Sequence, residues 1–110
     1  MIKVEELRRM LTKVGFEKTY LIEEAPNCSI YMGIYRDREF IIAVFKGTSS
    51  FYAKIIPATL VSTSHWQCNY IKYSPMGWYV FSDSIDDLVK RLGEKILKII
   101  ELKFPKQFIT

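Results

Sequence analysis

The chain has 110 residues, of which 49% are hydrophobic and 25% are charged, and its net charge is +4. These values are typical of one ordinary globular domain and exclude a disordered or low-complexity chain. The excess of basic residues gives only weak support for an anionic partner, because no run of five like charges marks a nucleic-acid-binding arm.

The first expected element is an amphipathic helix from about Val4 to Val14. Apolar residues recur there at helical spacing, with Leu7 and Leu11 between the two ends. Gly15 follows as a C-cap. The apolar stripe of this helix is expected to pack on a sheet.

A β-rich stretch follows the helix, and its period-two alternation predicts three strands before residue 47. They are expected at Phe16–Glu24, Ser29–Arg36 and Phe40–Lys46. The polar tip Arg36-Asp37-Arg38-Glu39 joins the last two of these as a hairpin. Because the third strand is apolar on both faces, it is expected to be central, or to be covered on its second side by a helix or another subunit.

The second half of the β-rich stretch is less regular. Phe51–Thr63 contains Pro57, which cannot donate to a ladder and predicts an edge strand or a break into two pieces. His65–Tyr73 is interpreted as a further strand. After the turn at Ser74-Pro75-Met76-Gly77, a short last strand is expected at Trp78–Phe81.

The C-terminal helix shows the strongest pattern in the chain. Its apolar stripe begins at Ile85 and continues to Ile100, and Ser84 with Asp87 resembles a capping box. Leu97 and Leu102 lie off this stripe and suggest a homodimer. The apolar tail, residues 104–110, cannot continue the helix through Pro105 and is expected to fold back onto the domain or onto a partner.

Together these elements predict a single α+β domain over residues 1–110. Its antiparallel meander sheet has five or six strands, and the N-terminal and C-terminal helices pack on one face. The other face is expected to be partly covered by the tail or by a second copy. The apolar runs are far shorter than the ~20 residues that cross a bilayer, and the first residues resemble no signal peptide, so we expect a soluble, intracellular protein without membrane partners.

Catalytic and metal-binding signatures are scarce. His65 and Cys68 are candidates for a base and a nucleophile in a small hydrolase, but residues three apart on a strand point to opposite faces. Cys28 and Cys68 are expected as free thiols, with a disulfide between them as the less favoured alternative. No zinc spacing, P-loop or dinucleotide fingerprint occurs, so no metal and no cofactor is expected.

The remaining signal is a set of aromatic and basic residues interleaved on the expected strands. They are Tyr31, Tyr35, Arg36 and Arg38 on the first hairpin and Trp66, Tyr70 and Lys72 on the later strand. Such residues serve as sheet filler, as a protein-interaction face, or as a platform for single-stranded nucleic acid.

The sequence therefore favours a non-enzymatic binding module that docks a protein partner or a second copy of itself. Single-stranded nucleic-acid binding is the first alternative, and a hydrolase using His65 or Cys68 is the second. An accessory or inhibitory role in a mobile element is one setting in which such small modules occur.

Overall fold

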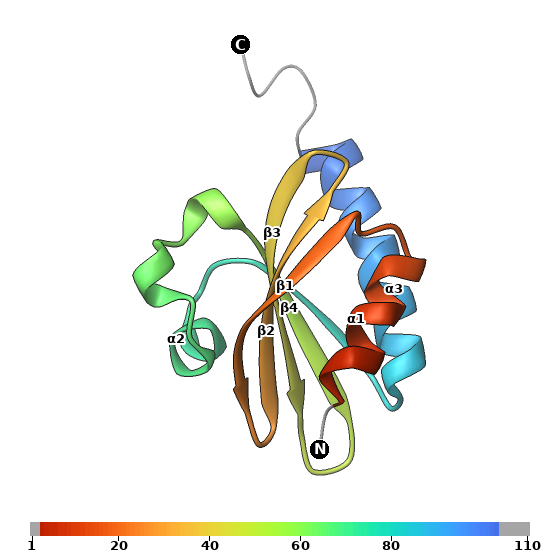
Figure 1. The fold of residues 1–110 in the computed structure, drawn as a ribbon, viewed down its shortest axis with the longest axis vertical. Helices are drawn as coiled ribbons and strands as arrows, with labels where there is room; N and C mark the ends of the chain where they lie inside the picture. The colour runs from red at the N-terminus through yellow and green to blue at the C-terminus, as the bar shows by residue number, and fades with distance from the viewer. Residues whose placement is uncertain (1–2, 104–110) are drawn as a thin grey trace.

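The structure is a computed structural model and describes residues 3–103. Five strands form one antiparallel sheet in the order β1-β2-β3-β4-β5, so the predicted α+β class and meander are confirmed (Figure 1). The strands are β1 (Lys18–Ala25), β2 (Cys28–Tyr35), β3 (Arg38–Lys46), β4 (Phe51–Pro57) and β5 (Trp78–Ser82).

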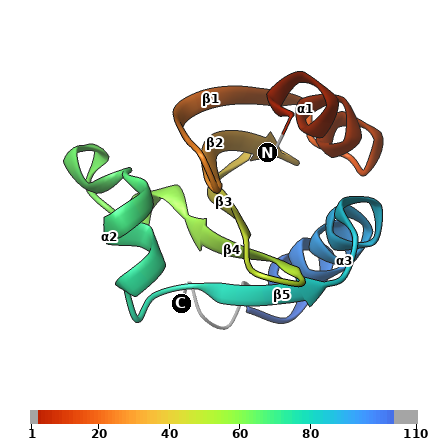
Figure 2. The same ribbon diagram turned by 90° about the horizontal axis from the view of Figure 1, so that it is seen from below.

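Two helices cover one face of the sheet (Figure 2). They are α1 (Val4–Lys13) and α3 (Ile85–Lys98), and a short π-helical turn, Ile99–Lys103, continues α3. Leu7 and Leu11 of α1 pack with Leu92 and Ile96 of α3 in one buried cluster against the sheet. Burial of these apolar stripes is the main force that holds the helices in place.

The other face is partly covered by residues 58–73, whose structure differs from the expectation. This segment forms two 3₁₀ turns, Ala58–Leu60 and Thr63–His65, and the helix α2 (Cys68–Tyr73), which lies across the sheet from α1 and α3 (Figure 2). The predicted strand His65–Tyr73 is therefore wrong. Cys68 and Ile71 are three residues apart, so a helix turns both toward the sheet, whereas a strand would separate them.

The predicted break at Pro57 is confirmed, because β4 ends at that residue. β4 itself lies between β3 and β5 and is not an edge strand. The sheet face opposite α1 and α3 was expected to be covered by the tail or by a second copy. Residues 58–73 cover part of it instead, and the tail at 104–110 lies outside the described residues.

The hairpin between β2 and β3 is tighter than predicted. Only Arg36 and Asp37 form the turn, and both have positive φ angles, 51° and 65°. Two left-handed residues are the conformation that matches the twist of a two-residue hairpin. Arg38 and Glu39 therefore belong to β3 and extend the central strand, whose residues 40–45 are buried on both faces, as predicted.

The start of α3 confirms half of the expected capping box. The backbone N–H of Asp87 donates to Ser84 Oγ at 3.2 Å. The Asp87 carboxylate does not return to Ser84 but accepts from Ser82 Oγ and Arg91 Nε. These two hydrogen bonds lower the pKa of Asp87.

Within residues 3–103, no helix combines the length and apolar character that crossing a bilayer requires.

Candidate functional site

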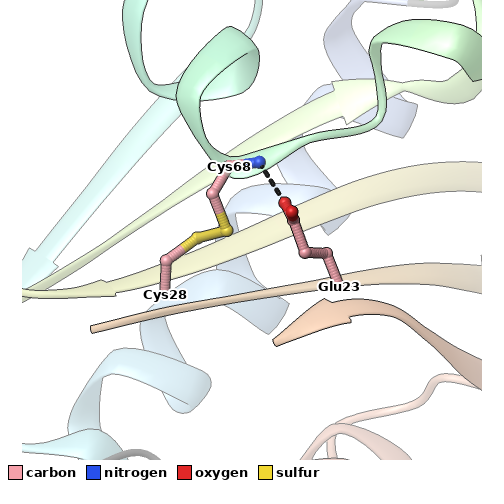
Figure 3. Close-up of a disulfide and its surroundings, with 3 residues drawn as sticks. All are labelled: Glu23, Cys28 and Cys68. Carbon is pink, nitrogen blue, oxygen red and sulfur yellow. Dashed lines mark hydrogen bonds between the residues drawn. A yellow bond between two sulfur atoms is a disulfide. The ribbon is translucent and has the colours of Figure 1, made fainter. Parts of the chain in front are cut away.

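The segment from residue 58 to residue 77 is fastened to the sheet by a disulfide (Figure 3). Cys28 at the start of β2 is bonded to Cys68 at the start of α2, with the two Cα atoms 6.3 Å apart. The favoured expectation of two free thiols is therefore wrong. Because residue 68 begins a helix that packs over the sheet, its side chain reaches β2. A strand over residues 65–73 does not predict this contact.

Two further contacts hold the ends of α2. The backbone N–H of Cys68 donates to the carboxylate of Glu23 on β1 (Figure 3). At the other end, the fully buried ammonium of Lys54 donates to the carbonyl oxygens of Ile71, at 3.1 Å, and of Ser74. An acid at the N-terminus and a base at the C-terminus match the helix dipole.

The pair proposed for hydrolysis is not assembled. The sulfur of Cys68 is bonded to Cys28, so no thiolate is available there. The ring of His65 stacks on the ring of Tyr70 with the centroids 4.2 Å apart. In the part of the chain that the structure describes, no three His, Cys, Asp or Glu side chains gather as metal ligands would.

Two of the seven predicted binding residues are inside the protein. Tyr31 and Tyr35 do share a face of β2, as predicted, but that face lies under the helices, where they are 0% and 4% exposed. They are core residues, and the interpretation of an exposed tyrosine face is wrong. Burial raises the pKa of the Tyr31 hydroxyl, and the neighbouring hydroxyl of Ser29 lowers it by a smaller amount without forming a hydrogen bond of normal geometry.

The predicted arginines lie on the surface at the hairpin tip. Arg36 and Arg38 are exposed, and the guanidinium of Arg36 lies 5.7 Å from the centre of the Tyr35 ring. Arg38 lines a hollow of about 310 Å³ between the hairpin and residues 57–59. The aromatic side chains next to the tip, Tyr35 and Phe40, are buried.

The other three predicted residues, Trp66, Tyr70 and Lys72, lie within residues 58–73, which cover part of the sheet, and do not share a strand face. The indole N–H of Trp66 donates to the carbonyl of Val61 at 3.0 Å, which closes the turn before α2. Tyr70 and Lys72 are exposed on α2, and Lys72 lies over the ring of Tyr73. The seven residues are therefore divided among the core, the hairpin tip and α2, and form no common surface.

An aromatic surface that the sequence interpretation missed lies beside α2, on strands β3, β4 and β5. We define it by four rings, Phe45, Tyr52, Tyr79 and Phe81, of which Phe45 is buried at the inner end of the row and Tyr52 is half-buried. Phe45 stacks on Tyr52 at 4.8 Å, and Phe81 stacks on both Tyr52 and Tyr79 at 5.9 Å. The outer two rings, Tyr79 and Phe81, are 43% and 61% exposed.

Strand register explains why these rings meet. Phe45 pairs with Tyr52 across β3 and β4, and Tyr52 pairs with Phe81 across β4 and β5. Cross-strand partners share a face, so the three rings form one row. Tyr79 is two residues from Phe81 and points the same way. The hydroxyl of Tyr79 reaches the carbonyl of Lys72 at 3.5 Å, which connects the row to α2.

Several cations lie near the aromatic surface, and two of them, Lys95 and Lys98 of α3, line the groove beside Tyr79 and Phe81 together with Glu94. Lys54 lies 5.0 Å from the centre of the Tyr79 ring, but its ammonium is fully buried and hydrogen-bonded. Arg91 is paired with Asp87 at 2.6 Å.

Part of the aromatic surface can be predicted from the sequence, since alternation in Trp78–Phe81 places Tyr79 and Phe81 on one face of the strand. That Phe45 and Tyr52 join them in one row follows only from the strand register, which the sequence does not show.

Comparison with models of known protein families, with curated proteins and with solved structures found no match.

Proposed function

We propose that this protein is a non-enzymatic binding module that docks a macromolecular partner on the aromatic surface. The observation that carries the proposal is the exposure of Phe81, 61%, at the end of a row of stacked rings. Large apolar side chains exposed together have a free-energy cost in water that binding removes. Tyrosine and phenylalanine are also the residue types enriched where proteins meet.

A protein partner is favoured over a nucleic acid by the charges around the rings. Binding of a single strand needs free cations that follow its phosphates, in addition to rings that stack on its bases. Near the aromatic surface Lys54 is buried and Arg91 is paired. Lys95 and Lys98 line one end of the surface beside Glu94, but Asp83 and Asp87 line the other end, so no continuous row of cations from the described residues follows the rings. The two predicted arginines, Arg36 and Arg38, lie at the opposite end of the strands.

The proposal is tested by panning a displayed library of random twelve-residue peptides against the immobilised chain. We expect peptides to be selected, and Phe81→Glu to weaken their binding at least tenfold. Leu60→Glu is the matched control, because Leu60 is also a large apolar residue, 51% exposed, but lies in the 3₁₀ turn after β4. This control variant is expected to bind the peptides as the natural chain does.

Two results would overturn the proposal. One is that the panned chain selects no peptides, or selects peptides whose binding is indifferent to Phe81→Glu. The other is that a fluorescent twenty-nucleotide thymidine strand binds tightly, with a steep salt dependence that Phe81→Glu removes, which would assign the surface to nucleic acid.

A further inference from the structure

The open edge of β5 borders the aromatic surface. Within the described residues β5 pairs only with β4, so one row of its backbone N–H and C=O groups has no strand beside it. Unpaired edges attract other strands, and natural proteins usually protect them with bulges, lysines or prolines. The two edges of this sheet differ in this respect.

The β1 edge carries such protection. Its register shifts between Leu21 and Glu23, which marks a bulge, and Lys18, Glu23 and Glu24 place charges along it. β5 reads Trp78-Tyr79-Val80-Phe81-Ser82, with an unbroken register and no charged residue or proline. The β5 edge is therefore regular, uncharged and suited to accept a strand.

The charges beside the β5 edge change sign from one end to the other. Near Tyr79 the groove between β5 and α3 is lined by Lys95 and Lys98, together with Glu94 and Arg91. Near Ser82 the lining contains Asp83 and Asp87, and the only cation among the described residues there, Arg91, is paired with Asp87. The order follows from the chain path, since α3 turns back after β5 and carries its acids in its first turn and its bases in its last.

From these features we infer that the occupant of the β5 edge is the β5 edge of a second copy, running antiparallel about a two-fold axis at Val80. This inference rests on the proposed function, because the second copy would enlarge the surface to which the partner binds. An edge that is basic at one end and acidic at the other is complementary to itself when reversed. A partner strand that is acidic along its whole length, or basic along its whole length, would instead face a like charge at one end of the β5 edge.

The aromatic residues fit the same arrangement. With Val80 opposite Val80 of the partner subunit, all five residues of β5 are paired, and Tyr79 lies opposite the partner's Phe81. Cross-strand aromatic pairs of this kind stabilise antiparallel edges. The row of Phe45, Tyr52 and Phe81 then continues into the second copy, and the two aromatic surfaces become one.

The inference is tested with the full chain by sedimentation equilibrium and by light scattering. We expect twice the mass of the 12.9 kDa chain, with a dissociation constant that rises in high salt. Lys95→Glu with Lys98→Glu makes both ends acidic and is expected to weaken the dimer at least tenfold. Adding Asp83→Lys is expected to restore part of the lost affinity.

The control is Lys13→Glu with Lys18→Glu, which makes the same change in net charge on exposed lysines at α1 and the β1 edge. This variant is expected to dimerise as the natural chain does. Amide hydrogen exchange adds a local readout, in which residues 78–82 exchange more slowly in the dimer than in the Lys95→Glu, Lys98→Glu variant.

Two results would overturn the inference. One is a monomer at a chain concentration of about 100 µM, and the other is a dimer whose dissociation constant is changed neither by the charge reversal nor by Phe81→Glu. Either result leaves the proposed function standing if selected peptides still depend on Phe81. If peptide binding is indifferent to Phe81 as well, both proposals fail.

Discussion

The buried ammonium of Lys54 on β4 donates to the main-chain carbonyl of Ile71 in the last turn of α2. It also bonds the carbonyl of Ser74 and lies over the ring of Tyr79. One side chain therefore connects the covering helix, the link to β5 and the aromatic surface. A buried cation is stable only with partners of this kind.

Replacing Lys54 tests this connection. Lys54→Met keeps the aliphatic stem but leaves two carbonyl acceptors without their donor, so we expect a loss of about 2 kcal/mol in the free energy of unfolding. Lys72→Met is the control, because Lys72 is exposed on α2, and its expected effect is within about 0.5 kcal/mol. Urea denaturation of both variants measures the difference, and equal stabilities would contradict the role given to Lys54.

The disulfide makes a second prediction. Cys28 and Cys68 are 40 residues apart, and closing a loop of this size stabilises a fold by about 2–4 kcal/mol. We expect a reductant to lower the stability of the natural chain by that amount, measured by urea denaturation. The Cys28→Ala, Cys68→Ala variant should already have the lower stability and should not respond to the reductant. Alkylation of two thiols in the denatured, unreduced protein would show that the bond is absent.

Gly77 sets the path of the link between α2 and β5. Its φ angle is +98°, and a Cβ atom added there would lie 2.6 Å from the carbonyl oxygen of Ile55. Gly77→Ala is therefore expected to cost about 2 kcal/mol or more.

Gly47→Ala is the matched control for Gly77→Ala. Gly47 has no positive φ, and its added Cβ would lie 3.3 Å from Ser50 O, so its expected cost is below about 1 kcal/mol. Thermal unfolding of both variants measures the difference. A Gly77→Ala variant as stable as the Gly47→Ala variant would show that the link tolerates a side chain there.

The pH dependence of stability tests the burial of Tyr31. Its pKa is raised from 10.0 by burial, so the unfolded chain releases this proton at a lower pH than the folded one. The contribution of Tyr31 to stability is therefore complete below pH 10 and declines as the pH rises through the folded pKa. Tyr31→Phe removes this alkaline decline.

The same substitution removes a buried hydroxyl whose interaction with Ser29 falls short of normal hydrogen-bond geometry, so at neutral pH we expect the stability of Tyr31→Phe to lie within ~1 kcal/mol of that of the natural chain. Tyr73→Phe, at a position that is 77% exposed, is expected to leave the pH profile unchanged. Denaturant midpoints from pH 7 to 11 measure both. A loss of stability well above ~1 kcal/mol in Tyr31→Phe at pH 7 would show that the hydroxyl forms a strong hydrogen bond with Ser29.

The elements in which hydrophobic residues recur with a regular helix or strand period were predictable from the sequence. The elements that depend on contacts between distant residues were not. The stripe of α3, the cap at Ser84 and the strand pattern of residues 28–46 were all readable locally. Residues 65–73 contain Tyr, Trp and Ile, which favour strands, but Cys68 and Ile71 are buried by a helix that the disulfide and Lys54 hold in place. Local propensity is weaker than such tertiary contacts.

The candidate surface was harder to predict for a related reason. The face on which Tyr31 and Tyr35 lie follows from the alternation, but which face the helices cover does not. Phe45, Tyr52 and Phe81 are spread over 37 positions of the sequence and meet only because the register of three strands aligns them. The prediction of an aromatic docking surface remains a proposal, now assigned to different residues.

The most direct test of the central claim is an amide map of the whole chain by nuclear magnetic resonance with a selected peptide bound. The proposal predicts that the largest shifts fall on residues 45, 51–54 and 79–82, and that Phe81→Glu abolishes them. The largest shifts at the hairpin tip around Arg36, or on the exposed side of α1, would contradict it.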